Sequence, residues 1–223
     1  MEDRPRKDAM GSFITFEGME GSGKTTQIRK AADFLARRGV SFLLTEEPGG
    51  TALGHILRKI LLDKTTLRIG DRAELLLFAA ARAQHVEEKI RPALKAGRVV
   101  LCDRFSDATV AYQGFGRRLE LESIRWLNRF CTASIRPDWT FLFDIPAEKG
   151  LERVQERSRA SGEAASGEDR FEGENTAFHR RIREGYLKIA GEEPDRFRLF
   201  NGTLPIEAIH DHVSKTLTEI LHL

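Results

Sequence analysis

A glycine-rich stretch near the start of the chain constrains the fold more than any other feature. Residues 18–25 read GMEGSGKT, which matches the phosphate-binding pattern G-x-x-x-x-G-K-[ST]. The apolar run at 13–16 precedes it and a helical pattern follows from Lys24, so the motif has the strand–loop–helix order that it requires. Backbone N–H groups of such a loop face a bound phosphate. We therefore expect a nucleoside triphosphate to be bound by Gly18, Met19, Glu20, Gly21, Ser22, Gly23, Lys24, Thr25 and Thr26.

Two residues of this loop carry the chemistry that a triphosphate needs. Lys24 is expected to reach the β- and γ-phosphates, and the Thr25 hydroxyl is expected to bind Mg²⁺. One alternative is a chance glycine-rich turn, which the flanking strand and helix argue against. The other is a degenerate loop that binds nucleotide without turnover, which the intact Lys24 and Thr25 argue against.

Size and composition limit the class of protein. The chain has 223 residues, 31% of them charged and 40% hydrophobic, which suits one globular domain. Its net charge of +2 indicates no nucleic-acid partner, and no apolar run is long enough for a membrane span. Cys102 and Cys131 are interpreted as buried free thiols. Residues 1–11 predict a disordered tail without the apolar region of a signal peptide, so we expect a cytoplasmic protein.

Strand-like and helical patterns alternate along the rest of the chain. This order predicts an α/β fold, a three-layer sandwich in which a five-stranded parallel sheet has helices on both faces. We expect a single domain over 12–223. The expected strands lie near 13–17, 41–45, 98–102, 139–144 and 196–200, and the expected helices near 24–38, 51–61, 71–95, 106–114, 120–132, 147–158, 174–190 and 205–221.

One segment departs from this alternation. Residues 158–174 read SRASGEAASGEDRFEGE, which is rich in small and charged residues and has few apolar side chains to anchor it. A surface loop without a role is one interpretation. The other is a short mobile lid, spanning about 157–173, whose arginines close over phosphates. The composition alone does not favour either.

Polar clusters follow the second and third predicted strands. Ligands of open α/β sheets lie beyond the carboxyl ends of the strands, so the EEPGGT run at 46–51 and the pair Asp103–Arg104 are expected near the triphosphate. Asp103 is a candidate for ordering Mg²⁺ together with Thr25, and Arg104 for binding a phosphate as a bidentate fork. The alternative is that Asp103 only caps a helix and Arg104 is solvated.

Phe78 and Arg82 lie four residues apart in an apolar helical stretch and therefore share one face. A ring and a guanidinium side by side can stack on a planar base and bind its edge. Taken alone, however, a phenylalanine in an apolar helix is more often a core residue.

Four motifs in order carry a family resemblance. FEGMEGSGKTTQ, EEPGGT, LLLFAAARAQHVEEKIRPAL and DRFSDATVAYQGFGR resemble the bacterial thymidylate kinases, a branch of the P-loop nucleoside monophosphate kinases. The resemblance runs from about Phe13 to the C-terminal helix. It implies transfer of the ATP γ-phosphoryl group to dTMP, giving dTDP and ADP for dTTP synthesis.

The resemblance also implies roles for individual residues. Phe78 would stack on thymine and Arg82 would bind a thymine carbonyl. Tyr112 would pack near the 2′ carbon of the sugar, and Glu20 would meet the 3′-hydroxyl. The loop at 201–203 would border the adenine. The full set implied for dTMP is Glu20, Arg58, Phe78, Arg82, Arg104, Thr109, Tyr112 and Gln113, with Arg58 and Arg104 on the phosphate.

Members of this family supply a catalytic arginine from either the P-loop or the lid. Positions 19–22 hold no basic residue, so the chain resembles the lid-arginine type. Of the available arginines we favour Arg153 and Arg159 over Arg157 and Arg170. The predicted catalytic residues are therefore Lys24, Arg104, Arg153 and Arg159. Two departures from the family pattern are Glu46, where relatives often have arginine, and a longer lid.

Competing functions predict different features. Another acceptor, such as UMP, CMP or a deoxynucleoside, is the nearest alternative, and Phe78 and Arg82, together with Thr109 and Gln113, argue for thymine instead. A GTPase-like switch would need an N-K-x-D element, which the sequence lacks. A non-enzymatic nucleotide-binding module would bind ATP without turnover. The resemblance also implies a homodimer in which the long third helix, with its alanines at 79–81 and 83, lies at the interface.

Overall fold

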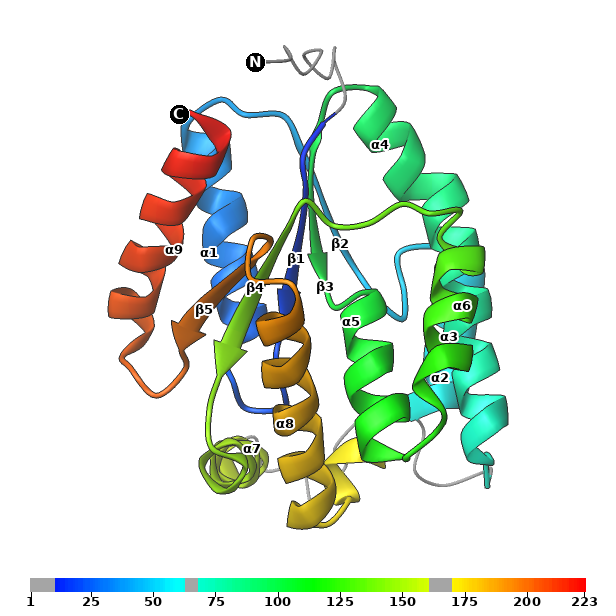
Figure 1. Ribbon diagram of the computed structural model, residues 1–223. Helices are drawn as coiled ribbons and strands as arrows, with labels where there is room; N and C mark the ends of the chain where they lie inside the picture. The colour runs from blue at the N-terminus through cyan, green and yellow to red at the C-terminus, as the bar shows by residue number, and fades with distance from the viewer. Residues whose placement is uncertain (1–10, 63–67, 161–169) are drawn as a thin grey trace.

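Five parallel strands form the centre of the molecule. The computed structural model describes residues 11–62, 68–160 and 170–223, and the sheet order is β2-β3-β1-β4-β5 (Figure 1). Every neighbouring pair is parallel, and all the carboxyl ends meet at one edge of the sheet. The predicted strands are confirmed to within one residue as β1 Phe13–Glu17, β2 Phe42–Glu46, β3 Val99–Asp103, β4 Trp139–Asp144 and β5 Phe197–Asn201.

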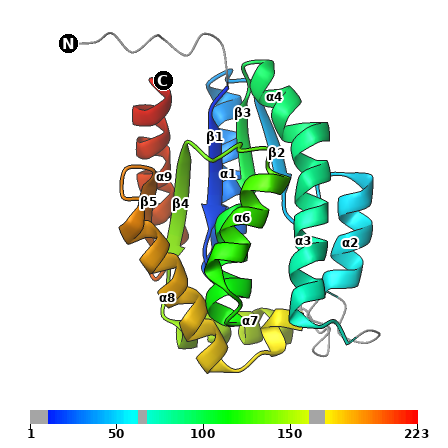
Figure 2. The ribbon, with the colours of Figure 1, turned by 45° about the vertical axis from the view of Figure 1, so that its right-hand side comes forward.

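Helices cover both faces of this sheet, as predicted. Ile14 and Phe16 point towards the face packed by α1 (Lys24–Arg37) and α9 (Ile206–Leu221), whereas Phe13 faces the opposite layer. Figure 2 shows α6 and α8 in front of the sheet and α1 behind it. The other elements are α2 Ala52–Leu62, α3 Asp71–His85, α4 Arg91–Lys95, α5 Ser106–Thr109, α6 Leu121–Cys131, α7 Ala147–Ala160 and α8 Thr176–Glu192.

The longest predicted helix, 71–95, is built from three consecutive segments. A π-helical stretch, η1 (Val86–Ile90), joins α3 to α4, and a second, η2 (Val110–Gly116), continues α5. Pro92 has no N–H group, so it cannot donate to the carbonyl four residues earlier, which favours a change of helical register beside it. Because η2 carries Tyr112 and Gln113, this widened turn also orients two of the side chains predicted to bind dTMP.

The predicted lid is anchored at its two ends. Its start, 157–160, belongs to α7, and its end forms the short 3₁₀ helix η3 (Arg170–Gly173), in which Phe171 is only 3% exposed. The Phe171 ring packs on Tyr112 and Phe178, so this end is held more firmly than its composition suggested. Lid residues 161–169 and tail residues 1–10 lie outside the described residues. Gly11, assigned to the tail, donates to the Leu94 carbonyl at 2.8 Å.

Gly150 allows α7 to pack against the P-loop. A Cβ atom at this position would lie 2.6 Å from the Glu20 carbonyl oxygen and 2.9 Å from Met19 Cε. A glycine inside a helix usually costs stability, and replacing it with alanine usually regains about 1 kcal/mol. Here we expect Gly150→Ala to destabilise the fold by about 1–3 kcal/mol, because the P-loop backbone would have to move.

Chemical denaturation of Gly150→Ala and Gly191→Ala tests this prediction. Gly191, near the end of α8, is the matched control because no atom lies within 4 Å of its added Cβ. We expect the control to be neutral or stabilised, and equal stability changes in both variants would contradict the packing argument.

Candidate functional site

The P-loop emerges from β1, whose neighbours in the sheet are β3 and β4. Gly23 adopts a left-handed φ of 89° immediately before α1, which begins at Lys24. The Thr25 hydroxyl donates to Asp103 Oδ2 at 2.7 Å, so the two predicted metal-ordering residues are in contact. Met19 is buried in the core, and therefore only its backbone is available to a phosphate.

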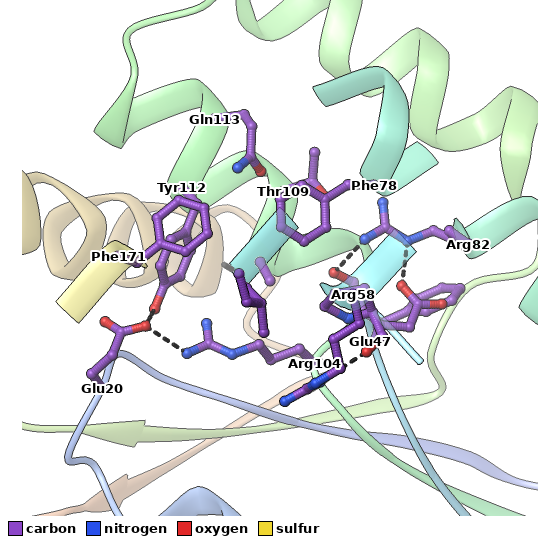
Figure 3. A pocket seen from close by; sticks show the side chains of 14 residues that line it. Glu20, Glu47, Arg58, Phe78, Arg82, Arg104, Thr109, Tyr112, Gln113 and Phe171 are labelled. Atoms are coloured by element: carbon purple, nitrogen blue, oxygen red, sulfur yellow. Dashed lines mark hydrogen bonds and ion pairs between the residues drawn. The ribbon is translucent and has the colours of Figure 1, made fainter. Parts of the chain in front are cut away.

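The eight residues predicted to bind dTMP line one cavity beside this loop (Figure 3). In the view of Figure 3, Phe78, Thr109 and Gln113 lie at one end of this cavity, and Glu20 and Arg104 lie at the other. The two ends are therefore chemically distinct, one aromatic and amide-bearing and the other charged. Further residues that line it, which the sequence analysis did not assign, are Glu47, Pro48, Leu62, Phe105, Ala108 and Phe171.

An ion pair closes the charged end. Arg104 Nη2 donates to Glu20 Oε1 at 2.9 Å, and the Tyr112 hydroxyl donates to the same oxygen. Arg104 has a left-handed φ of 66°, an uncommon conformation for a residue with a side chain. Burial opposes ionisation of Glu20, but Arg104, helped by His179 and Lys24, outweighs it and lowers the pKa of this carboxyl. Glu20 is therefore an anion and a strong hydrogen-bond acceptor.

Arg82 at the opposite wall is held by three partners. It is buried, and its Nε donates to Glu47 Oε2 at 2.7 Å, while Nη1 and Nη2 donate to Asn128 Oδ1 and the Phe105 carbonyl. His85 Nδ1 lies 2.9 Å from the other Glu47 oxygen. Arg82 is therefore a rigid group whose remaining N–H bonds are available to the cavity. Arg82 also lines the cavity.

Arg58 reaches the cavity from α2. Its Nη1 donates to the Pro48 carbonyl at 2.8 Å and lies 3.3 Å from Glu46 Oε2. The acid at position 46 thus pairs with the arginine that was assigned to the acceptor phosphate. This contact lowers the positive charge that Arg58 presents.

The four arginines considered for the lid differ in their surroundings. Arg153 Nη1 donates to the carbonyls of Gly202, at 2.7 Å, and Gly21, which ties the P-loop to the loop after β5. Arg159 is exposed and forms no hydrogen bond or ion pair with the described residues. Arg157 pairs with Glu172, and Arg170 pairs with Glu74. Only Arg153 therefore touches the P-loop in this arrangement.

A buried carboxyl behind the site was missed from the sequence. Glu17, the last residue of β1, accepts from the Phe105 N–H and from the Tyr186 hydroxyl, both at 2.7 Å. Burial, together with the nearby Asp107 carboxylate, raises the pKa of Glu17 to about 8. The contact with Phe105 steadies the segment that carries Arg104. A charged residue ending an otherwise buried strand was the available signal.

Two further polar residues were also missed. His179 is buried on α8 with Nδ1 3.3 Å from Glu20 Oε2. Glu74 is buried on α3, four residues before Phe78, and accepts from Gln113. An acidic residue on the same helical face as Phe78 and Arg82 could have been recognised from spacing alone.

Two negative findings concern the residues that the structure describes. Within 11–62, 68–160 and 170–223, no helix combines the length and apolar character of a membrane span. Over the same ranges, no group of three or more His, Cys, Asp or Glu side chains is arranged to hold a metal ion.

Comparison with known proteins identifies one family throughout. A family model described as thymidylate kinase matches residues 16–213. The thymidylate kinase of Desulfovibrio desulfuricans is 52% identical over 197 residues, covering 88% of this chain and 90% of that protein. That of Geotalea daltonii is 53% identical over 193 residues, covering 86% and 90%. A crystal structure of thymidylate kinase from Ehrlichia chaffeensis superposes with a TM-score of 0.71 at 32% identity, covering 93% of this chain and 99% of that one.

The raised pKa of Glu17 makes stability depend on pH. A carboxyl in the unfolded chain has a pKa near 4.5, whereas Glu17 in the folded protein has a pKa of about 8. The folded state therefore keeps a proton that the unfolded state releases, and this contribution to stability is lost as pH rises towards and through 8. The glutamine of Glu17→Gln cannot ionise. We therefore expect the melting temperature of the variant, measured relative to that of the wild type, to rise between pH 5 and pH 8.5.

Thermal melts of the two proteins across this pH range measure the effect. Glu207→Gln is the control, because Glu207 is exposed and pairs with Lys30 on the surface. Curves for Glu17→Gln and the wild type that stay parallel over the whole range would contradict the prediction.

Proposed function

The chain belongs to the thymidylate kinase family and phosphorylates dTMP to dTDP with ATP as donor, and we propose that the cavity beside the P-loop is the dTMP site. One observation carries the proposal. The eight residues assigned to dTMP come from the P-loop, α2, α3, the Asp103–Arg104 segment, α5 and η2, and all of them line a single cavity. Seven of the eight, all but Phe78, carry a polar or charged group, and polar side chains that converge on a cavity are typical of a ligand site.

The base is proposed to bind at the end of the cavity near Phe78. The Phe78 ring is half-buried with one side on the cavity, which suits stacking on a pyrimidine. Arg82 is held by Glu47 and Asn128, and so it offers a fixed donor for a carbonyl oxygen on the base edge. Thr109 and Gln113 line the same end.

The sugar and phosphate are proposed to bind at the charged end. The ionised Glu20 accepts from the 3′-hydroxyl, and Tyr112 fills the space beside the 2′ carbon, which disfavours ribose. Arg104 and Arg58 bind the phosphate. Because Arg104 is already held by Glu20, its guanidinium loses little conformational freedom on binding.

Phosphoryl transfer in this site needs no general base, because the attacking oxygen of dTMP is already anionic. The protein has to align two polyanions and offset their repulsion. Lys24 and Arg104 provide fixed positive charge on the two sides of the transferred group. The Thr25 hydroxyl and the Asp103 carboxylate are oxygen groups of the kind that Mg²⁺ prefers. When bound with ATP, Mg²⁺ would supply further charge neutralisation.

Arg153 and Arg159 are proposed as the arginines that act with the lid, which we assign to about 157–173 of a single nucleoside monophosphate kinase domain over 12–223. Arg153 is supported by its contact with the P-loop carbonyl of Gly21. Arg159 is supported by its place at the end of α7 within the assigned lid, where its exposed side chain forms no hydrogen bond or ion pair with the described residues. The loop at 201–203 is proposed to border the adenine, since Arg153 ties Gly202 to the P-loop.

The broader setting is also proposed. The enzyme acts in the cytoplasm on the path to dTTP, as a homodimer whose interface includes α3 and α6. Three exposed apolar side chains support this face: Leu76 is 58% exposed, Trp126 57% and Phe130 72%. Leu76 and Trp126 line a groove together with Leu75, Leu119 and Leu127, and Phe130 stacks on Trp126. An apolar patch of this kind is typical of a protein interface. Ala79 and Ala81 pack within their own chain instead.

A coupled ADP-release assay with Mg-ATP tests the proposed site. We expect kcat/KM for dTMP to exceed that for CMP and UMP by at least about 100-fold, because those acceptors mismatch the base edge or carry a 2′-hydroxyl. For dUMP, which lacks only the methyl group of dTMP, we expect kcat/KM to be about 10-fold or more below the value for dTMP. Equal use of CMP would retain the kinase and reject the assigned pocket. ATP binding without turnover of any acceptor would reject the enzymatic function.

Sedimentation velocity tests the proposed dimer. We expect the wild type to sediment as a dimer and Trp126→Glu to shift it towards monomer, since a charge would be buried in an apolar interface. Leu199→Glu is the matched control, because Leu199 on the edge strand β5 is also 57% exposed but lies away from α3 and α6. A monomeric wild type, or dissociation by both substitutions, would contradict the assigned face.

A further inference from the structure

Glu74 lies directly behind the base end of the cavity. It is 0% exposed, and it shares one face of α3 with Phe78 and Arg82 because the three residues are spaced four apart. Phe78 and Arg82 line the cavity, whereas Glu74 does not. Its carboxylate instead meets side chains from η2 and η3 on the far side of the wall.

Among the described residues, every side chain that forms a hydrogen bond with this carboxylate is a donor. Gln113 Nε2 donates to Glu74 Oε1 at 2.7 Å, and Arg117 Nη2 donates to Oε2 at 3.3 Å. Arg170 Nη2 also donates to Oε2. A carboxylate between two guanidinium groups can only accept hydrogen bonds. It therefore requires Gln113 to turn its NH₂ group towards Glu74.

The consequence for the cavity concerns the other half of the Gln113 amide. With the NH₂ group held by Glu74, the carbonyl oxygen Oε1 is left for the cavity that Gln113 lines, and no described residue donates to it. Rotating the amide would place its oxygen against the carboxylate and leave a buried acceptor without a donor, which is costly. Glu74 thus makes this point of the cavity wall an acceptor.

We propose that Glu74 is a positioning residue for base selection, which acts by fixing Gln113 as a hydrogen-bond acceptor. Thymine carries a donor at N3 and an acceptor at O4, and these match Gln113 Oε1 and the Arg82 guanidinium. Cytosine carries an unprotonated N3, which would face the Gln113 Oε1 acceptor, and an amino group at position 4, which would face the Arg82 donor. Neither hydrogen bond can therefore form. The inference rests on the proposed dTMP site, and it adds the residue that makes Gln113 a hydrogen-bond acceptor rather than a donor in that site.

Glu74→Gln is the informative substitution. The variant keeps the size of the side chain but offers both an amide oxygen and an NH₂ group, so Gln113 can turn over and present its own NH₂ group to the cavity. The comparison acceptor is 5-methyl-dCMP, which keeps the methyl group of thymine and changes only the polar edge. We expect the dTMP/5-methyl-dCMP ratio of kcat/KM to fall by about 10-fold or more, with KM for ATP unchanged within twofold.

A double-mutant cycle separates positioning from a structural role through Arg117 or Arg170. If Glu74 acts through Gln113, Glu74→Gln added to Gln113→Ala leaves the acceptor ratio of the single Gln113→Ala variant unchanged. The same loss of selectivity in both backgrounds would overturn the inference, as would an unaltered ratio in Glu74→Gln. If Gln113→Ala itself keeps the wild-type ratio, the proposed dTMP site fails together with the inference.

A measurement on the unsubstituted protein provides an independent test. The side-chain NH₂ resonances of Gln113, assigned by their loss in Gln113→Ala, are expected to show nuclear Overhauser effects to the Glu74 methylene protons with dTMP bound. Contacts from that NH₂ group to the base in place of Glu74 would overturn the inference.

Discussion

The ion pair between Glu20 and Arg104 is the interaction on which the rest of the site depends. It joins the P-loop to the segment after β3, two segments that are 84 positions apart in the chain. Arg104 holds a left-handed backbone, and neighbouring contacts support that conformation: its N–H donates to the Phe16 carbonyl, and Glu17 binds the next N–H. Because one carboxylate orients both Arg104 and Tyr112, the proposed positions of the phosphate and the sugar would be set together.

Buried carboxyl groups recur behind each part of the cavity. Glu47 holds Arg82, Glu74 holds Gln113, and Glu17 holds the Phe105 backbone. Each carboxylate lies on a different element from the group that it orients, so the site is built from contacts between elements. Burying the charges of Glu47 and Glu74 costs stability, which strong hydrogen bonds offset. Glu17, whose pKa is raised to about 8, instead keeps its proton at neutral pH. The arrangement provides a rigid set of donors and acceptors around the cavity that we propose for dTMP.

Much of this fold could be predicted from local pattern. The strand bounds were correct to within one residue, because short apolar runs between helical patterns identify buried parallel strands. The residues assigned to dTMP do line one cavity. The anchoring of the predicted lid was not foreseen, since Phe171 is the one large apolar side chain in the sequence 158–174 and its burial depends on Tyr112 and Phe178, which lie on other helices.

The sequence by itself determined the P-loop, the alternation of strands and helices and the identity of the residues at the strand ends. Each of these depends on residues a few positions apart. Only the tertiary structure decided which buried polar groups meet, for example that Glu74 contacts Gln113, 39 positions away, and that Glu46 faces Arg58. Such pairs depend on how η2 packs against α3 and how the loop after β2 folds back on α2. A hydrogen bond needs its atoms within about 3 Å of each other, and local periodicity carries no information at that scale across separate elements.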